Sequence, residues 1–222
     1  SSDVCSSDLI PGWRSDPAEL RHALSVPPDE IWQAHTAAKR ALLALANQRT
    51  GQVLREDVLT LGLARRVTPY KRNDLLFHDL DELRAVARAA GGLQVVMAGK
   101  AHPRDEAGKA MLTRMVAVAR AAPQEIRAVF LEDYDASMAR VLTGGVDLWL
   151  NTPRKPFEAS GTSGMKAAVN GVPQLSTQDG WWLEGGIEGV TGWSVGSREP
   201  SSGDDETRSE EHTSELQSRG LI

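Results

Sequence analysis

The sequence predicts an α/β fold, a Rossmann-like parallel sheet with helices on both faces. From residue 58 onward, short apolar runs alternate with segments whose apolar residues recur at helical spacing. Parallel strands need long crossovers, usually helices, and right-handed crossovers place those helices on both faces of the sheet. The apolar runs are also followed by polar motifs, as expected where parallel strands end at a common ligand-binding edge. No internal repeat is visible.

The composition favours some classes of protein and excludes others. The chain has 222 residues, 41% of them hydrophobic and 25% charged, which is typical of a soluble globular protein able to bury a core. No apolar run approaches the roughly 18 residues of a membrane helix. The net charge of −5 argues against a general nucleic-acid binder. We therefore expect one ordinary domain with additions.

Both ends of the chain are expected to be artefacts. Residues 1–9 and 208–222 look like in-frame translations of short-read sequencing adapters, and ordinary polar tails are the alternative. We therefore expect a piece of a longer protein, with a connector and helix at 10–50 and an incomplete cofactor- and phosphate-binding domain at 51–207. The only cysteine, Cys5, lies in an adapter-like segment, so no disulfide framework is expected.

The elements can be assigned in order along the chain. Residues 10–25 lack a sustained period and indicate a connector. The prolines and acids at 27–30 favour a helix start, and helical spacing continues to about Asn47, before Gly51. Strands are expected at residues 58–63, 93–98, 128–131, 146–150 and 172–176. Further helices are expected from Leu76 to near Gly91, around residues 111–118 and over residues 137–142, and a short one is expected to begin near Gly164.

Five polar motifs follow the predicted strands. They occupy residues 64–72, 99–103, 132–135, 158–164 and 179–182. Ligands of open parallel sheets bind outside the carboxyl ends of the strands. The five loops are therefore expected to converge on one site.

The stretch 158–171 carries the strongest signal. Its small residues at a strand-to-helix turn expose backbone N–H groups, which favours a phosphate at the helix start. Gly161 and Gly164 are expected to let the backbone approach a ligand, while Ser160, Thr162 and Ser163 offer short donors. Lys166 is expected in the first helical turn, where a lysine suggests a Schiff base to pyridoxal phosphate. A glycine-rich turn with a solvated lysine is the alternative.

A basic loop faces this stretch in the predicted arrangement. Arg65, Arg66, Lys71 and Arg72 put four cations into one loop after a buried strand. Guanidinium groups suit bidentate phosphate recognition, and a lysine adds a point charge, so the loop indicates two phosphates close together. A solvated basic turn is the alternative.

Other polar residues after the strands suit a sugar. Tyr70 and Tyr134 can pack on a flat ring or form a hydrogen bond with a sugar hydroxyl, although a tyrosine here is as often structural. Glu158 offers the acceptor that sugar hydroxyls need, with a surface carboxylate as the alternative. His102 is expected to be structural, and no group has metal-ligand spacing.

Together these motifs resemble the α-glucan phosphorylases, the glycogen and maltodextrin phosphorylase family, in their shorter prokaryotic form. The resemblance covers about residues 58–196, and residues 158–171 are its most specific part. By this matching, Lys166 falls on the family's pyridoxal-phosphate lysine. Arg66 falls on the arginine that holds the substrate phosphate, and Lys71 on a lysine that contacts the cofactor phosphate. The resemblance makes these three the expected catalytic residues.

The resemblance also assigns the remaining site residues. Arg65, a lysine in better-known members, and Tyr134 fall on cofactor-binding positions, and Gly161 and Thr162 fall on the phosphate cradle. Tyr70, Glu158 and Ser160, with Gly161, correspond to residues that bind the glucosyl unit. Thr68 and Pro69 depart from a histidine and a glutamate of the larger enzymes, and Ser163-Gly164 replaces a glycine–asparagine pair.

The resemblance implies that the full protein is a pyridoxal-phosphate-dependent enzyme located in the cytoplasm. It releases glucose 1-phosphate from an α-1,4-glucan with inorganic phosphate and retains configuration, the cofactor phosphate serving as proton donor and acceptor. Its GT-B-type architecture has two Rossmann-like domains, and this chain resembles the second only. The missing N-terminal domain is then an expected partner, and the chain alone is expected to be inactive; an oligomer is possible.

Two other functions remain open. A retaining nucleotide-sugar glycosyltransferase, similar to glycogen synthase, has the same architecture but needs no lysine at position 166. An inactive sugar-binding paralogue could bind through Trp181 and Trp182, although one of these is expected to close the core. Binding alone does not require Arg66, Lys71, Thr162 and Lys166 together, which favours the phosphorylase.

Overall fold

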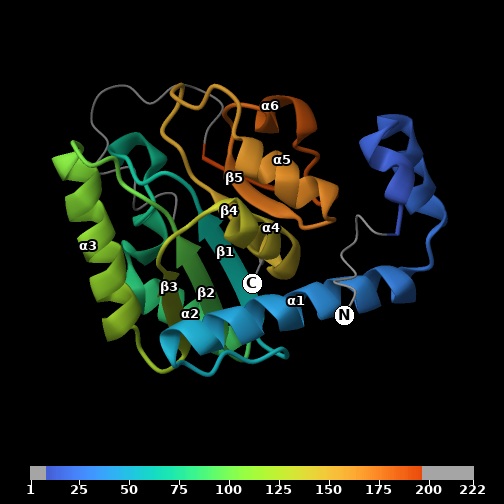
Figure 1. Ribbon diagram of the computed structural model, residues 1–222. Helices are drawn as coiled ribbons and strands as arrows, with labels where there is room; N and C mark the ends of the chain where they lie inside the picture. The colour runs from blue at the N-terminus through green and yellow to red at the C-terminus, as the bar shows by residue number, and fades with distance from the viewer. Residues whose placement is uncertain (1–8, 197–222) are drawn as a thin grey trace.

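The computed structural model describes residues 9–196 and centres on a six-stranded sheet in which all paired strands are parallel. The strands are β1 (Leu59–Ala64), β2 (Leu93–Ala98), β3 (Ile126–Leu131), β4 (Leu148–Asn151), β5 (Gln174–Thr177) and β6 (Gly192–Val195). Their order across the sheet is β3-β2-β1-β4-β5-β6 (Figure 1). The predicted α/β fold with a parallel sheet is confirmed.

The helices link these strands. They are α1 (Pro28–Thr50), α2 (Leu80–Ala89), α3 (Glu106–Ala121), α4 (Ala136–Gly145), α5 (Thr162–Val169) and α6 (Trp182–Gly185). Aspartates start three of them: the carboxylates of Asp79, Asp105 and Asp135 each accept a backbone N–H of the first turn. No helix within residues 9–196 is both long and apolar enough to cross a membrane.

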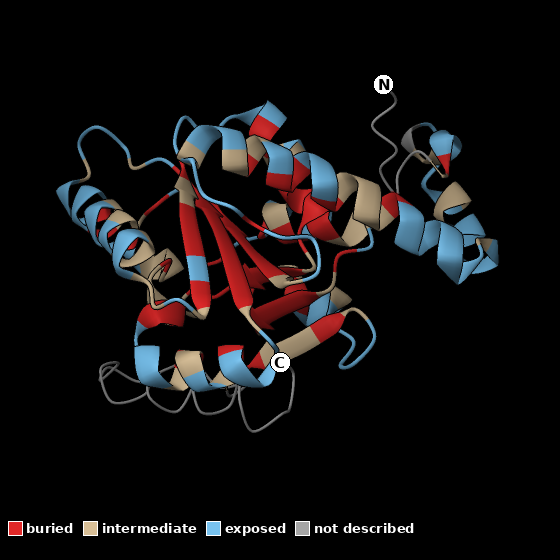
Figure 2. Ribbon diagram, turned by 90° about the horizontal axis from the view of Figure 1, so that it is seen from below, coloured by how far each residue is buried: buried red, intermediate tan, exposed pale blue. Residues whose placement is uncertain are grey.

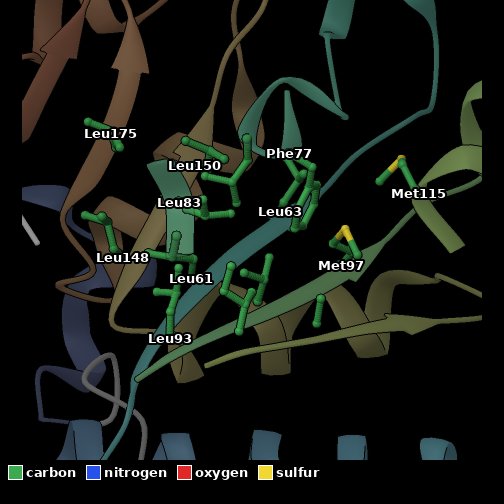
Figure 3. Packing of buried hydrophobic residues seen from close by; sticks show 14 of the residues in the cluster. Leu61, Leu63, Phe77, Leu83, Leu93, Met97, Met115, Leu148, Leu150 and Leu175 are labelled. Atoms are coloured by element: carbon green, nitrogen blue, oxygen red, sulfur yellow. The ribbon is translucent and has the colours of Figure 1, made fainter. Parts of the chain in front are cut away.

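Two apolar clusters lie on opposite faces of the sheet. One joins the sheet to α2 and α3 through residues such as Leu83 and Met115 (Figure 3). The other joins it to α1, α4 and α5 through residues such as Leu42 and Ala167. Figure 2 shows the strands buried between helices whose outer surfaces are exposed. Met111 and Met115 belong to the first cluster, so both methionines fill core space, as expected.

A polar network fixes α1 beside the amino ends of β1 and β4. The Asp147 carboxylate lies 2.8 Å from Nε2 of His35 and accepts hydrogen bonds from Lys39 Nζ at 2.6 Å and the Thr60 N–H at 2.8 Å. Burial alone would raise the pKa of Asp147, but these hydrogen bonds and the charge of Lys39 hold it below its usual value. This network therefore favours the ionised carboxylate. The first turns of α1 project past the sheet (Figure 1).

Strand β6 was not predicted from the sequence, and several predicted helix and strand boundaries were wrong. β6 has only four residues, begins at Gly192 and lacks an apolar run, so its pattern is weak. The segment predicted as a connector contains the 3₁₀ helices η2 (Pro11–Arg14) and η3 (Pro17–Ser25). Leu76 lies in η5 (Leu75–Phe77), because the Asp79 cap starts α2 later than predicted.

The predicted adapter segments at 1–9 and 208–222 lie outside the described residues, except for Leu9. The last part of the predicted 51–207 domain also lies outside them. These divisions of the chain remain predictions.

Candidate active site

The strand order reverses between β1 and β4, which are neighbours in the sheet. β1 leads toward β2 and β3 on one side, whereas β4 leads toward β5 and β6 on the other. Ligands of open parallel sheets usually bind at the carboxyl edge beside such a switch point, so we name the region between the loops after β1 and β4 the candidate crevice. The basic loop follows β1 and the Ser/Gly stretch follows β4, so the two strongest sequence motifs meet at this switch point.

Arg65 is buried at the base of the crevice. Its guanidinium donates to the side-chain oxygens of three residues, Asn73 at 2.8 Å, Asn151 at 2.6 Å and Thr152 at 3.0 Å. Burial lowers the pKa of Arg65 to about 9, while the nearby charge of Glu158 opposes that change. Arg65 thus remains cationic at neutral pH and ties the loops after β1 and β4 together.

The other cations of the basic loop differ in their surroundings. Arg72 donates to the backbone oxygens of Thr152 at 3.0 Å and Pro153 at 3.2 Å, so it also joins the two loops. Arg66 is exposed and makes no hydrogen bond or ion pair with the rest of residues 9–196. The loop therefore contains two arginines that hold its conformation and one that is free to meet an anion.

Lys71 and Glu158 form an ion pair across the crevice. Their side chains are only 12% and 7% exposed. The Lys71 ammonium also lies 5.0 Å from the ring centre of Tyr70, a favourable cation–π distance. A carboxylate, an ammonium and a phenol, all predicted site residues, are thus brought together by the fold.

The Ser/Gly stretch forms a turn that leads directly into α5. Gly161 precedes the helix in the left-handed region at φ 80°, and no side chain caps the helix start. The backbone oxygen of Ser160 accepts the Trp181 N–H at 2.8 Å, and the Asp179 carboxylate accepts the Glu158 N–H at 2.9 Å. The loop after β5 therefore supports the turn and leaves the N–H groups at the start of α5 available to an anion.

The prediction that Lys166 lies in the first turn of its helix is wrong, because α5 begins at Thr162. Lys166 lies in the last turn, so the argument from an opposed helix dipole does not apply. Its side chain is exposed and has no hydrogen-bond partner within residues 9–196. It is therefore accessible to a ligand, although it does not lie at the helix start.

Gly164 also differs from the prediction. It is buried, and a Cβ at this position would lie 2.2 Å from Oε1 of Gln174 and 2.8 Å from Nε1 of Trp181. Gly164 thus lets α5 pack closely on neighbouring side chains rather than letting a ligand approach. Gly161 has the positive φ that favours glycine, and its predicted contact with a ligand stays a prediction.

Three other residues that the sequence analysis discussed have contacts within the protein. Tyr134 follows β3 and packs against the α1 face of the core, where burial raises its pKa. His102 accepts the Arg104 N–H at 3.1 Å, in keeping with a structural role. Trp182 is buried and donates to Ser194 Oγ at 3.0 Å, so it closes the core.

Sequence reasoning missed the polar residues that shape the crevice. Asn73, Asn151 and Thr152, which hold Arg65, lie outside the predicted motifs, and Asp179, which holds the backbone of Glu158, lies in the 179–182 motif but was given no role. All four are buried polar residues. The position of Asn151 and Thr152 at the end of an apolar run was the signal available, because such residues face the carboxyl edge.

A cleft of about 700 Å³ runs elsewhere, beside the edge strand β3 and the ends of α1 and α3. Its lining includes Arg49, Arg120 and Arg127 but none of the predicted site residues. We place the candidate site at the β1–β4 switch point, because side chains that the sequence predicted to bind phosphate or sugar gather there, namely Arg65, Tyr70, Lys71 and Glu158.

Known proteins are similar to this chain in sequence. The model of the family described as carbohydrate phosphorylase matches residues 2–187. The chain belongs to the carbohydrate phosphorylase family. The resemblance identified from residues 58–196 is therefore confirmed.

Several members of the carbohydrate phosphorylase family are similar to this chain in sequence. The chain is 41% identical to a maltodextrin phosphorylase of Thermococcus litoralis over 198 residues, which cover 82% of this chain and 24% of that protein. It is 41% identical to a glycogen phosphorylase of Aquifex aeolicus, with 78% and 28% covered. It is 46% identical to a glycogen phosphorylase of Mycobacterium tuberculosis, with 64% and 16% covered. The chain thus spans about a quarter of the length of the first two relatives.

Proposed function

We propose that this chain is part of a pyridoxal-phosphate-dependent α-1,4-glucan phosphorylase. The parent protein would use inorganic phosphate to release glucose 1-phosphate from glycogen or maltodextrin, with retention of configuration. Family membership and the names of the relatives support this proposal. The structural observation that carries it is the meeting of Lys71, Glu158 and the uncapped start of α5 at one switch point.

The residues present fit the proposed cofactor. Gly161 supplies no capping side chain, so the N–H groups of Thr162 and Ser163 can bind a phosphate. Lys166, four residues later on α5, supplies the accessible amine that would hold the cofactor's aldehyde. Lys71 would add a positive charge beside the cofactor phosphate, and Arg65 would add its buried charge to the same region. Tyr134 would lie beside the cofactor by its family position.

When bound, the cofactor would supply a phosphate group able to donate and accept a proton near the glycosidic oxygen. The chain's own residues would place the reactants for that step. Arg66, exposed and unpaired within the described residues, would bind the substrate phosphate through its planar fork. Two anions brought close together repel, and the positive charges of the basic loop would offset that repulsion.

Glu158, Tyr70 and Ser160 would bind the glucosyl unit. Glu158 has the acceptor oxygens that sugar hydroxyls need, and its burial strengthens such hydrogen bonds. Tyr70 lies next to Lys71, so the sugar would bind beside the charges that act on the phosphates. Holding the reactants in one geometry is the main contribution we assign to this domain.

The parent protein would contain the rest of the crevice. Because the chain spans about a quarter of the first relatives, we propose that a further domain of the same protein closes over the carboxyl edge. The proposal includes the cytoplasmic location that the resemblance implies. This chain alone would then lack activity.

The proposal is tested by assaying the intact parent protein with maltodextrin and inorganic phosphate. We expect glucose 1-phosphate to form only when phosphate is present, and activity to fall when the cofactor is removed. Transfer from a nucleotide sugar without phosphorolysis would instead support the glycosyltransferase alternative.

A further inference from the structure

Phe157 is an apolar side chain in an unusual position. It is 59% exposed, although the next residue, Glu158, is only 8% exposed. Its ring centre lies 6.3 Å from that of Tyr70, and the two rings are tilted by 51°. This is a normal separation for an aromatic pair, and it leaves most of the Phe157 ring uncovered.

The backbone holds the two aromatic residues in place. The N–H of Phe157 donates to the Arg154 oxygen at 3.0 Å, and the N–H of Arg154 donates to the Tyr70 oxygen at 2.6 Å. The loops after β1 and β4 are therefore joined at this point. The ring of Phe157 is presented by a fixed turn of the crevice.

The chemistry around Phe157 suits a sugar. A pyranose ring has hydroxyl groups around its rim and apolar C–H groups on its faces. Glu158 supplies a buried acceptor for hydroxyls, and Phe157 supplies an uncovered aromatic face. Binding sites that orient a ligand combine apolar surface with a few placed polar groups in this way.

Exposure increases outward along these residues. Glu158 is buried, Tyr70 is intermediate and Phe157 is exposed. A linear glucan must enter such a crevice from outside, with the unit to be transferred at the inner end. The following sugar units then lie toward the solvent-exposed side, where Phe157 is found.

We propose that Phe157 binds the glucan unit next to the one that is transferred, by packing its ring against the apolar face of that sugar. This inference rests on the proposed phosphorylase function and adds a residue that determines glucan affinity. Glucose 1-phosphate contains the transferred unit and the phosphate but no further sugar. Phe157 therefore acts on the glucan and not on glucose 1-phosphate.

The test measures the synthetic reaction of the intact parent, with maltodextrin as acceptor and glucose 1-phosphate as donor. We expect Phe157→Leu, which keeps apolar bulk but removes the ring, to raise the KM for maltodextrin about tenfold, which equals ~1.4 kcal/mol. The KM for glucose 1-phosphate should change less than about twofold on this account. Phe157→Tyr should keep both values near those of the wild type.

Val53→Ala is the matched control, because Val53 is 65% exposed and lies before β1, away from the carboxyl edge. It should change neither KM. An unchanged KM for maltodextrin in Phe157→Leu would overturn the inference, as would an equal rise in both KM values. Failure of Phe157→Leu to fold would also overturn it, because Phe157 would then pack against another part of the parent and not against a sugar. A wild-type parent that cannot make glucan from glucose 1-phosphate would overturn the proposed function itself.

Discussion

Lys71 and Glu158 are 87 residues apart in the sequence, yet their charged groups form an ion pair between the loops after β1 and β4. Both side chains are nearly buried, at 12% and 7% exposure. Removing charges from water is costly, so each of these groups depends on the other for its stability inside the crevice. The pair therefore connects the basic loop to the Ser/Gly turn.

Lys71→Ala should destabilise the intact parent by about 3–5 kcal/mol, because it leaves the buried Glu158 carboxylate without its partner. The double variant with Glu158→Ala should lose less than the sum of the two single losses. Chemical denaturation of all three variants measures this coupling. Strictly additive losses would show that the two side chains do not stabilise each other.

Arg66→Ala should impair phosphorolysis while leaving the cofactor bound, because Arg66 is assigned to the substrate phosphate. Loss of a charged contact in a desolvated site is worth about 2–4 kcal/mol, so the rate should fall roughly 30- to 1000-fold. Lys71→Ala should also reduce cofactor retention. Phosphate dependence and cofactor content would be measured on both purified variants. If Arg66→Ala loses cofactor but keeps its phosphate dependence, the two phosphate assignments are reversed.

The sequence predicted the sheet because its central strands are continuous apolar runs. Val95 and Val96, for example, are both fully buried, one on each face. The short strand β6 was missed because Gly192 and Ser194 interrupt the apolar pattern. Its place in the sheet comes from parallel pairing with β5, in which Gly192 lies so close to Gln174 that a Cβ would be 1.9 Å from the Gln174 backbone oxygen.

Part of the candidate site was predictable and part was not. The convergence of the loops follows from parallel strands, so the meeting of Lys71 with Glu158 could be expected in outline. The burial of Arg65 could not, since it depends on Asn151 and Thr152 across the switch point. Sequence spacing cannot tell a phosphate-binding arginine from one that holds two loops together.

Gly164→Ala should destabilise the protein. Its Cβ would lie 2.2 Å from Oε1 of Gln174 and 2.8 Å from Nε1 of Trp181, so side chains beneath α5 would have to move. Overpacking of this kind costs about 1–3 kcal/mol. Gly144→Ala in α4 is the control, because its Cβ would make only ordinary contacts, 3.6 Å or longer. Thermal unfolding of both variants decides the point, and equal melting temperatures would contradict the packing described for Gly164.

Acid should weaken the attachment of α1. The pKa of Asp147 is lowered in the folded protein, so its contribution is present above about pH 4 and is lost as the pH falls through the folded pKa. Asp147→Asn should therefore be less stable near neutral pH and should lose less further stability below pH 4. Unfolding free energies measured across this range check the prediction. Parallel pH profiles for wild type and variant would show that Asp147 does not contribute.

The proposed function requires the cofactor to bind covalently through Lys166, which lies exposed on α5. Borohydride reduction of the intact parent followed by peptide mass mapping tests this directly. The account predicts one pyridoxyl label per chain, carried by Lys166, and no label in a Lys166→Ala variant. A label on another lysine, or no label on the wild-type protein, would contradict it.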